Sequence, residues 1–270
     1  MPFIKMHGTG NDFVVIDGRK RSVRISKKLA QRLCHRRFGI GADQVLVIAS
    51  SQKADVQMRI FNADGSEVEH CGNGIRCLAK YVTQEENGKK TLSVETLSGI
   101  SVVKLLEDNV RVDMGAPRLE AKEIPVQAQG RVIARPFMQD GFQMEMTCVS
   151  MGNPHCVIAV EAVEPFPVEV VGSQIENDPF FPNRTNVEFV EFVSRDRVKI
   201  RVWERGSGET WACGTGACAV AVAGVLLKKT GRKVQVDLKG GALEIYWDPK
   251  TDHVFLTGLA EEVYRGEIEI

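Results

Sequence analysis

The chain has 270 residues and balances 35 basic against 35 acidic side chains, so its formal net charge at pH 7 is zero. This balance creates no broad field for nucleic acid or an anionic membrane surface, and no apolar run approaches the roughly 18 residues that span a bilayer. The first ten residues show no signal-peptide pattern, and the seven cysteines form no CxxC pair. We therefore expect a cytoplasmic protein of about two domains, without a disulfide framework, a membrane partner or a nucleic-acid partner.

The first half of the chain predicts a series of short strands and two helices. Ser26 is a plausible N-cap for a helix that runs through Arg37, with Gly39 just past its end. A second helix is expected from Gly74 to about Gln84. Alternating or continuous apolar runs predict strands near residues 3–6, 13–16, 45–49, 56–60, 91–96, 100–106 and 110–114.

The second half repeats this order after a boundary at 115–117. Strands are expected near residues 145–149, 156–160, 188–193 and 198–203, and the stretch 262–270 alternates as a strand that could complete the first domain's sheet. The proline-rich segment 165–182 matches the first half least well. The run after Cys213 is apolar on all sides, which indicates a helix surrounded by sheet.

Two cysteine turns relate the halves to each other. Cys71 and Cys213 are each followed by Gly-x-Gly and an apolar run, and 213 − 71 gives an offset of 142 residues. The same offset pairs further polar positions, namely Asn11 with Asn153, Gln44 with Asn186, Asn62 with Glu204 and Glu67 with Glu209. A period this long indicates two duplicated domains rather than a solenoid. We expect an α/β (α+β) fold of two pseudo-symmetric domains, residues 1–115 (completed by about 262–270) and 116–261, with the active site in the cleft between them.

A cysteine at the N-terminus of a helix has its thiolate form favoured. Two such cysteines facing each other suit inversion at a carbon that bears a proton, because one thiolate removes the proton and the opposite thiol delivers another. Backbone N–H groups of the two glycine turns would then stabilise negative charge on a neighbouring carboxylate, without metal or pyridoxal. The sequence leaves open which cysteine is the resting thiolate.

Polar side chains around these turns can hold an amino-acid substrate. The amides can bind amino and carboxylate groups without adding charge, Arg205 can grip a second carboxylate, and Glu204 can accept from an ammonium. His155 and Glu204 are the natural neighbours to tune the thiols.

Several motifs together closely resemble the diaminopimelate epimerase family. They span nearly the whole chain and are His7–Phe13 (HGTGNDF), Phe61–Glu67 (FNADGSE), Cys71–Cys77 (CGNGIRC), Gly152–His155 (GNPH), Arg184–Phe189 (RTNVEF) and Glu204–Thr210 (ERGSGET), with Ala212–Gly216 (ACGTG). The resemblance implies a homodimeric, cofactor-independent and metal-independent isomerase that interconverts LL- and meso-diaminopimelate for lysine and peptidoglycan precursors. It also implies that each domain is a mostly antiparallel sheet wrapped around a central helix.

The resemblance assigns roles to individual residues. It makes Cys71 and Cys213 the acid/base pair, and it gives His155 and Glu204 a tuning role. It implies substrate contacts at Asn11, Gln44, Asn62, Gly72, Asn73, Asn153, Asn186, Glu204, Arg205, Gly214 and Thr215.

Three other interpretations stay open on the sequence. One is a two-cysteine racemase of histidine, proline or hydroxyproline, against which Arg205 and the full set of amides argue. Another is a thiol redox protein, which the missing CxxC disfavours, and the third is an amino-acid-binding module, which gives no reason for paired cysteines. Cys34, Cys77, Cys148, Cys156 and Cys218 lie in helix or strand runs, where cysteine is usually a small buried apolar residue.

Overall fold

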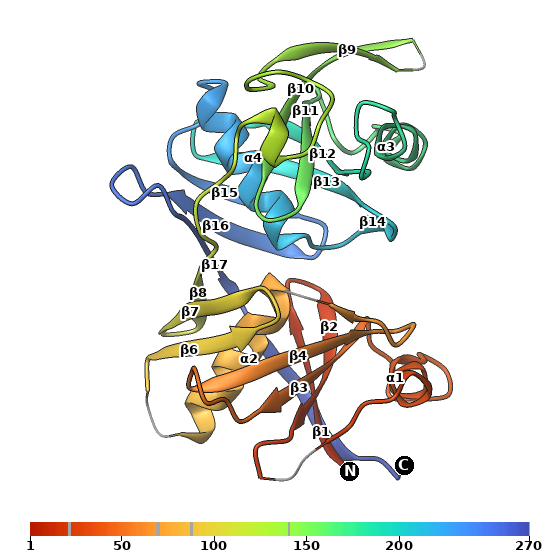
Figure 1. Cartoon of the computed structure of the whole chain (residues 1–270), viewed down its shortest axis with the longest axis vertical. Helices are drawn as coiled ribbons and strands as arrows, with labels where there is room; N and C mark the ends of the chain where they lie inside the picture. The colour runs from red at the N-terminus through yellow and green to blue at the C-terminus, as the bar shows by residue number, and fades with distance from the viewer. Residues whose placement is uncertain (21–22, 69–70, 87–88, 140, 270) are drawn as a thin grey trace. The chain divides into compact units, whose positions relative to one another are not determined.

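The computed structural model describes residues 1–20, 23–68, 71–86, 89–139 and 141–269. The chain divides into two compact units, and each combines helices with a mostly antiparallel sheet (Figure 1). Unit 1 comprises Met1–Asp113 and Thr257–Ile270, and unit 2 comprises Met114–Leu256. The mixed α/β class predicted from the sequence is confirmed.

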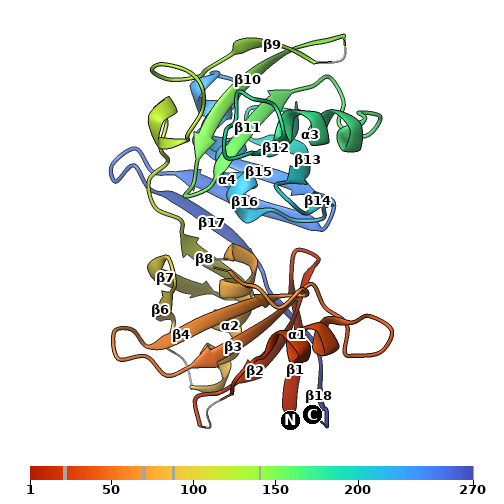
Figure 2. The ribbon, with the colours of Figure 1, turned by 45° about the vertical axis from the view of Figure 1, so that its right-hand side comes forward.

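Unit 1 is built around a twisted sheet whose strands come from both ends of the chain. The strands are β1 (Pro2–Gly8), β2 (Asn11–Asp17), β3 (Gln44–Ala49), β4 (Val56–Asn62), β5 (Glu67–Val68), β6 (Thr91–Thr96), β7 (Gly99–Leu106), β8 (Asn109–Asp113) and β18 (Glu261–Glu267). β1 lies between β18 and β2 and is antiparallel to both, whereas β2–β3 and β4–β6 are parallel. The two chain termini therefore lie close together, and the Met1 amino group donates to the Ile268 carbonyl oxygen at 2.6 Å (Figure 2).

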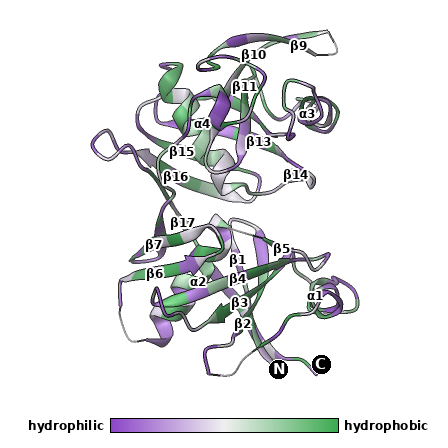
Figure 3. Cartoon of the chain, viewed as in Figure 1, coloured by the Kyte–Doolittle hydropathy of each residue, from purple (hydrophilic) through white to green (hydrophobic). Residues whose placement is uncertain are grey.

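Two helices belong to unit 1. α1 (Lys27–Cys34) begins at the predicted N-cap, where the Ser26 hydroxyl accepts from the Leu29 N–H at 3.2 Å. In Figure 3 it shows hydrophilic and hydrophobic segments side by side, as expected for a helix with one buried face. The prediction that it runs through Arg37 is wrong. His35 is extended, and its Nδ1 accepts from the backbone N–H groups of Arg37 and Phe38, which turns the chain away from the helix axis.

The second helix of unit 1, α2 (Gly72–Glu85), is the internal one. It is buried along most of its length, and even the guanidinium of Arg76 is fully enclosed. Arg76 donates to the Thr9 hydroxyl at 2.8 Å and to the carbonyl oxygens of Gly72 and Leu259 at 3.2 Å each. These bonds fix the start of α2, which carries Cys71, against the β1–β2 turn.

Unit 2 repeats this plan with its own strands. They are β9 (Arg135–Gln139), β10 (Phe142–Ser150), β11 (Pro154–Ala159), β12 (Asn186–Phe192), β13 (Arg197–Glu204), β14 (Gly208–Thr210), β15 (Lys233–Leu238), β16 (Gly241–Trp247) and β17 (Val254–Leu259), the last of which leads back into unit 1. A short 3₁₀ turn, η1 (Ala121–Glu123), precedes them. As in unit 1, the second and third strands of the repeat, β11 and β12, are parallel, and β12 and β13 are antiparallel.

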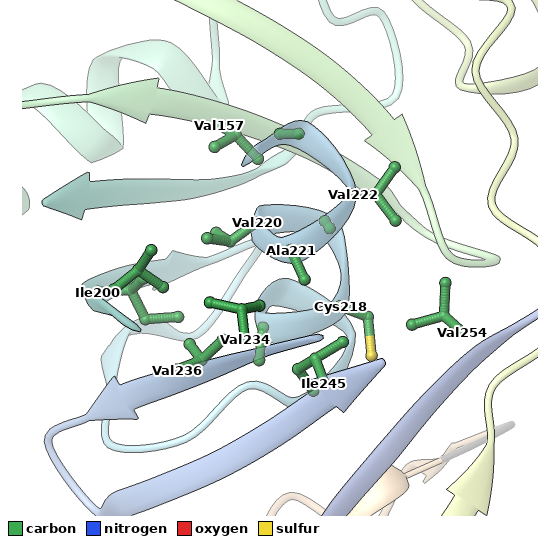
Figure 4. Close-up of a cluster of buried hydrophobic side chains, with 14 of the residues drawn as sticks. Val157, Ile200, Cys218, Val220, Ala221, Val222, Val234, Val236, Ile245 and Val254 are labelled. Atoms are coloured by element: carbon green, nitrogen blue, oxygen red, sulfur yellow. The ribbon is translucent and has the colours of Figure 1, made fainter. Parts of the chain in front are cut away.

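Helix α4 (Gly214–Leu226) is the core of unit 2. Its residues from Gly216 to Gly224 are all buried, which confirms that the apolar run after Cys213 forms a helix enclosed by sheet. Figure 4 shows Val220 and Ala221 among side chains from the surrounding strands, including Ile200 and Val234. Ala, Gly and Val dominate this helix, so the sheet can approach its backbone closely.

Helix α3 (Val168–Glu176) lies in the proline-rich segment, for which no helix was predicted. The prolines flank the helix and do not interrupt it, because Pro167 is its N-cap residue and Pro179 follows its end. The offset of 142 residues relates α3 to α1, since 27 and 34 become 169 and 176. It also relates β3 (Gln44–Ala49) to the first six residues of β12. The duplication therefore covers helices and strands, including the segment where the sequence similarity is weakest.

Candidate functional site

Cys71 is the N-cap residue of α2. Its backbone is extended (φ −146°, ψ 109°), and its Sγ accepts from the Gly74 N–H at 3.4 Å. The side chain is half-buried. A sulfur at this position lies at the positive end of the helix dipole, which favours the thiolate over the thiol.

Neutral amides surround Cys71. Asn11, at the start of β2, lies with its Oδ1 3.8 Å from the Cys71 sulfur, and the same oxygen accepts from Asn73 Nδ2 at 3.2 Å. The other end of the amide donates to Asp43 Oδ2 at 2.9 Å, so the orientation of Asn11 is fixed. The Cys71 thiol thus meets an amide oxygen that accepts hydrogen bonds without contributing a charge.

Gln44 and Asn62 form a second amide pair in unit 1. They are directly opposite each other on β3 and β4, and Gln44 Nε2 donates to Asn62 Oδ1 at 2.8 Å. Asn62 Nδ2 in turn donates to the Ser66 hydroxyl at 3.0 Å. Within the described part of the chain, the buried Oε1 of Gln44 has no hydrogen-bond partner. The pair therefore keeps one acceptor available for an N–H group.

Cys213 occupies the matching position on α4. Its backbone is also extended (φ −122°, ψ 106°), and its Sγ accepts from the Gly216 N–H at 3.4 Å. The Thr215 hydroxyl lies 3.5 Å from the same sulfur. Burial raises the pKa of the Cys213 thiol well above its ordinary value, and the carboxylates of Glu204 and Glu188 raise it further. The hydrogen bonds from Thr215 and Gly216 act in the opposite direction.

Glu204 ends β13 beside Cys213. Burial raises the pKa of this carboxyl group, and the hydrogen bonds from the Thr210 hydroxyl and from Cys213 lower it. Both members of the Glu204–Cys213 pair therefore resist losing their proton. Because the two groups interact, the titration of each depends on the other.

His155 is fully buried and lies directly against the carboxyl group of Glu188. His155 Nδ1 lies 2.6 Å from Glu188 Oε1, and its Nε2 lies 3.0 Å from Asn153 Oδ1. Asn153 Nδ2 donates to the Thr215 hydroxyl at 3.3 Å. Analysis of the sequence did not identify Glu188 as a functional residue, because it lies within a strand motif. The signal that could have revealed it is a charged residue in a buried strand, at the position that Leu46 occupies in the first half.

Asn186 and Arg205 organise the loop after β13. Asn186 Nδ2 donates to the Pro154 carbonyl oxygen at 2.8 Å, and its Oδ1 accepts from the Arg205 N–H at 2.9 Å. The Arg205 guanidinium donates to the Asn183 carbonyl oxygen at 3.1 Å. Asn186 thus orients the backbone next to Glu204, and Arg205 is held close to that backbone.

The predicted site residues fall into one group in each unit. Asn11, Asn73 and Gly72 lie with Cys71, and Gln44 pairs with Asn62 on neighbouring strands. In unit 2 the group around Cys213 contains Gly214, Thr215, Asn153, His155 and Glu204, with Asn186 and Arg205 at the adjoining turn. No cluster of His, Cys, Asp or Glu side chains among the described residues has the arrangement of a metal site. Nor is any helix in these ranges long and apolar enough to cross a membrane.

Comparison with known proteins gives consistent similarities. A family model described as diaminopimelate epimerase matches residues 3–120 and 147–263. The chain is 51% identical to a diaminopimelate epimerase of Moorella thermoacetica, with all of both chains covered. It is 48% identical to diaminopimelate epimerase 1 of a Nostoc species, covering 98% of this chain and 99% of that one.

Solved structures support the fold. A PhzF-family phenazine biosynthesis protein of Bacillus anthracis aligns with a TM-score of 0.70 at 18% identity, over 100% of this chain and 99% of that one. A hydroxyproline epimerase of Agrobacterium vitis, with bound trans-4-hydroxy-L-proline, aligns with a TM-score of 0.69 at 13% identity, over 98% and 91%. At these identities the likeness shows the fold alone.

Proposed function

This chain belongs to the diaminopimelate epimerase family, and from that premise we propose that it interconverts LL- and meso-diaminopimelate with Cys71 and Cys213 as its two bases. The observation that carries the proposal is the matched geometry of the two cysteines. Each caps a helix, and each sulfur accepts an N–H from the residue three positions later. A one-base enzyme would have no need for this repetition.

The reaction needs two bases because it inverts a carbon centre. One thiolate takes the α-proton from one face, and the opposite thiol gives a proton to the other face, so the proton does not return to its original side. The proposal therefore requires both sulfurs to reach the same α-carbon. Each epimerisation exchanges the protonation states of the two cysteines, and proton exchange with water restores the starting state before the next turnover in the same direction.

Charge on the substrate carboxylate rises as the α-proton leaves. Backbone N–H groups of Gly72 and Asn73, and of Gly214 and Thr215, stand at the two helix N-termini and would donate to these oxygens. In this mechanism the stabilisation comes from oriented peptide dipoles, so the chemistry calls for neither pyridoxal nor a metal ion.

The remaining polar residues would hold the two amino-acid heads of the substrate. Neutral amides of Asn11, Gln44, Asn62, Asn153 and Asn186 suit ammonium and carboxylate groups that must be bound without shifting the charge of the cysteines. Arg205 would bind the distal carboxylate in a bidentate manner, and Glu204 would accept from the substrate ammonium. His155 and Glu204 would tune Cys213.

The proposal also covers the cellular location, oligomeric state and biosynthetic role of the enzyme. We place it in the cytoplasm as a homodimer that supplies meso-diaminopimelate to lysine and peptidoglycan-precursor biosynthesis. These statements follow from the family resemblance and from the balanced charge of the chain.

Proton NMR in D₂O tests the reaction. With reduced protein, a metal chelator and no added pyridoxal, the α-proton signal of LL-diaminopimelate should disappear while the meso isomer forms. Cys71→Ala and Cys213→Ala should each lower the inversion rate by at least about 10³-fold, since each removes an acid/base group. Cys77→Ala and Cys218→Ala are the matched controls, because they remove buried thiols from the same two helices and should retain activity.

The outcome separates the proposed reaction from its alternatives. Exchange of proline or trans-4-hydroxy-L-proline, with diaminopimelate left unchanged, would overturn the choice of substrate. Failure of all three amino acids to exchange, with both thiols titrating as free, would overturn the two-base reaction and favour a redox role.

A further inference from the structure

A continuous chain of hydrogen bonds in unit 2 leads from a buried carboxylate to Cys213. It runs from Glu188 Oε1 to His155 Nδ1 (2.6 Å), from His155 Nε2 to Asn153 Oδ1 (3.0 Å) and from Asn153 Nδ2 to Thr215 Oγ1 (3.3 Å). The last link joins Thr215 Oγ1 to Cys213 Sγ at 3.5 Å. Three side chains thus connect a fully buried glutamate to the sulfur through four contacts.

The burial of Glu188 and His155 sets the position of one hydrogen. Both side chains have 0% exposure, and a buried pair carrying a net charge would be strongly unfavourable. Glu188 Oε2 is buried and has no hydrogen-bond partner among the described residues, so a proton placed there would be an unsatisfied donor. An electroneutral pair is then either carboxylate with imidazolium or carboxylic acid that donates from Oε1 to the Nδ1 of a neutral imidazole. In both cases His155 carries a hydrogen on Nε2, and that hydrogen points at the Asn153 oxygen.

This hydrogen then fixes the direction of the other links. Because Asn153 Oδ1 accepts from His155, its Nδ2 is turned toward Thr215 and donates to the hydroxyl oxygen. A hydroxyl group has one hydrogen, and its oxygen is already accepting. Asn153 Nδ2 cannot accept this hydrogen, so when Cys213 is a thiolate the Thr215 hydrogen is directed to its Sγ and stabilises the negative charge.

Cys213 depends on such donors because its surroundings oppose a negative charge. Burial and two carboxylates, Glu204 from β13 and Glu188 from β12, raise the pKa of its thiol. His155 from β11 also faces this group and pairs with Glu188. Packing here is close. A Cβ atom added at Gly216 would lie 2.7 Å from Glu188 Oε1 and 3.2 Å from Cys213 Sγ.

We propose that Glu188 is a positioning residue for Cys213, which acts through His155 and Asn153 to direct the Thr215 hydroxyl hydrogen onto the sulfur. The inference rests on the proposed function of Cys213 and deepens it. Without Glu188, a neutral His155 can carry its hydrogen on Nδ1. The unprotonated Nε2 then accepts from Asn153, the amide reverses, and Thr215 donates to Asn153 Oδ1 and no longer to Cys213.

A double-mutant cycle tests this direction of donation. The two changes are Thr215→Val, which removes the hydroxyl, and Glu188→Leu, which installs the residue found at the equivalent position of unit 1, Leu46. Both are made in a Cys71→Ala background, and thiolate formation by Cys213 is followed by ultraviolet absorbance against a Cys213→Ala reference. This readout involves no turnover, so it is independent of the substrate.

The expected result is a strong coupling between the two changes. With Glu188 present, Thr215→Val should lower the thiolate fraction of Cys213 by about tenfold at a given pH, because a hydrogen bond to a charged sulfur is lost. With Leu at position 188, the same change should lower it less than about twofold. Equal effects in the two backgrounds would overturn the proposal.

A conservative variant, a control variant and an NMR measurement complete the test. Thr215→Ser should retain the thiolate fraction, because serine supplies the same hydroxyl. Glu191→Gln is the matched control on β12, where the carboxylate pairs with Lys199 on the surface and should not affect Cys213. If Glu188→Leu does not fold, ¹⁵N NMR of histidine in the unmodified protein decides: a hydrogen on His155 Nε2 is required, and an unprotonated Nε2 overturns the chain.

The failure of this inference differs from the failure of the proposed function. An uncoupled thiolate titration in a protein that still epimerises diaminopimelate removes the role of Glu188 and leaves the two-base reaction intact. If the effects of the two substitutions on the thiolate titration are coupled but the protein exchanges no diaminopimelate, the positioning role of Glu188 stands. The assignment of diaminopimelate as the substrate is then rejected.

Discussion

The two cysteine turns share one backbone geometry and differ in what lies behind them. In unit 1, a Cβ added at Gly74 would meet the Leu46 and Phe13 side chains at 3.2 and 3.3 Å. The matching glycine of unit 2, Gly216, faces the Glu188 carboxylate at 2.7 Å. The same space beneath the helix is therefore hydrocarbon in one unit and charged in the other.

The offset of 142 residues allows the residues around the two cysteines to be compared position by position. Three neutral residues of unit 1, Leu46, Phe13 and Asn62, correspond to the titratable residues Glu188, His155 and Glu204 of unit 2. Duplication has thus preserved the helix cap that holds each sulfur, while ionisable groups have gathered around Cys213. The two cysteines have equivalent positions at their helix N-termini, and the carboxyl groups around Cys213 raise the pKa of its thiol.

Among the tests of this difference, we expect the largest effect from Glu204→Gln. Glu204 accepts a hydrogen bond from Cys213 and raises the pKa of its thiol, and glutamine would keep the shape of the side chain but neither carry this charge nor take up a proton. We expect the epimerisation rate to fall at least about 10²-fold, the usual scale for a lost acid/base partner. At the same time the thiolate of Cys213 should form at lower pH, because a neighbouring negative charge is gone. Stopped-flow exchange and thiolate titration measure the two effects.

A carboxylate elsewhere in unit 2 provides the control for this change. Glu244 on β16 is partly exposed and pairs with Lys233 at 2.8 Å, so Glu244→Gln should leave both measurements unaltered. An unchanged rate in Glu204→Gln would contradict the idea that the ionisable neighbours of Cys213 in unit 2 contribute to the reaction.

Matched glycine substitutions probe the packing difference with a smaller effect. Ala at either Gly74 or Gly216 improves helix propensity slightly, but the new Cβ must displace a neighbour. At Gly216 that neighbour is a carboxylate oxygen held by His155, and at Gly74 it is the end of a leucine side chain. We expect Gly216→Ala to lower the epimerisation rate about tenfold more than Gly74→Ala does. Similar rates, in variants with similar thermal unfolding, would show that the two sites tolerate crowding alike.

The sequence was sufficient for the cysteine caps but not for the charges behind them. A cysteine followed by Gly-x-Gly and an apolar run specifies a helix N-terminus through local rules, so the positions of Cys71 and Cys213 followed directly. Glu188 was missed because its importance depends on a tertiary contact with His155, 33 residues away. Helix α3 was not predicted because the segment is rich in proline. The prolines flank the helix, however, and do not interrupt it. Helix α1 ends earlier than predicted because His35 Nδ1 accepts hydrogen bonds from the backbone N–H groups of Arg37 and Phe38. Helix propensity does not include such side-chain contacts.

Acid stability offers the smallest and most local test of the difference between the units. Asp12 follows Asn11 in unit 1, and the offset places Pro154, which cannot ionise, at its counterpart. Although burial alone would raise the pKa of Asp12, hydrogen bonds from Arg36 and Lys5 lower it from 3.8 to about 2. A depressed carboxyl pKa stabilises the fold above the unfolded value near 4, and this contribution is lost as the pH falls through about 2.

Asp12→Asn should therefore destabilise unit 1 by about 2 kcal/mol near neutral pH, and the difference from the unmodified protein should shrink steadily between about pH 4 and pH 2. Urea unfolding over this range, followed by probes specific to each unit, measures the effect. Trp203, Trp211 and Trp247 all belong to unit 2, so tryptophan fluorescence reports on unit 2, whereas hydrogen exchange of β1 and β2 amides reports on unit 1. An equal loss in both units, or a difference that does not change with pH, would show that the Asp12 cluster does not account for the acid sensitivity of unit 1.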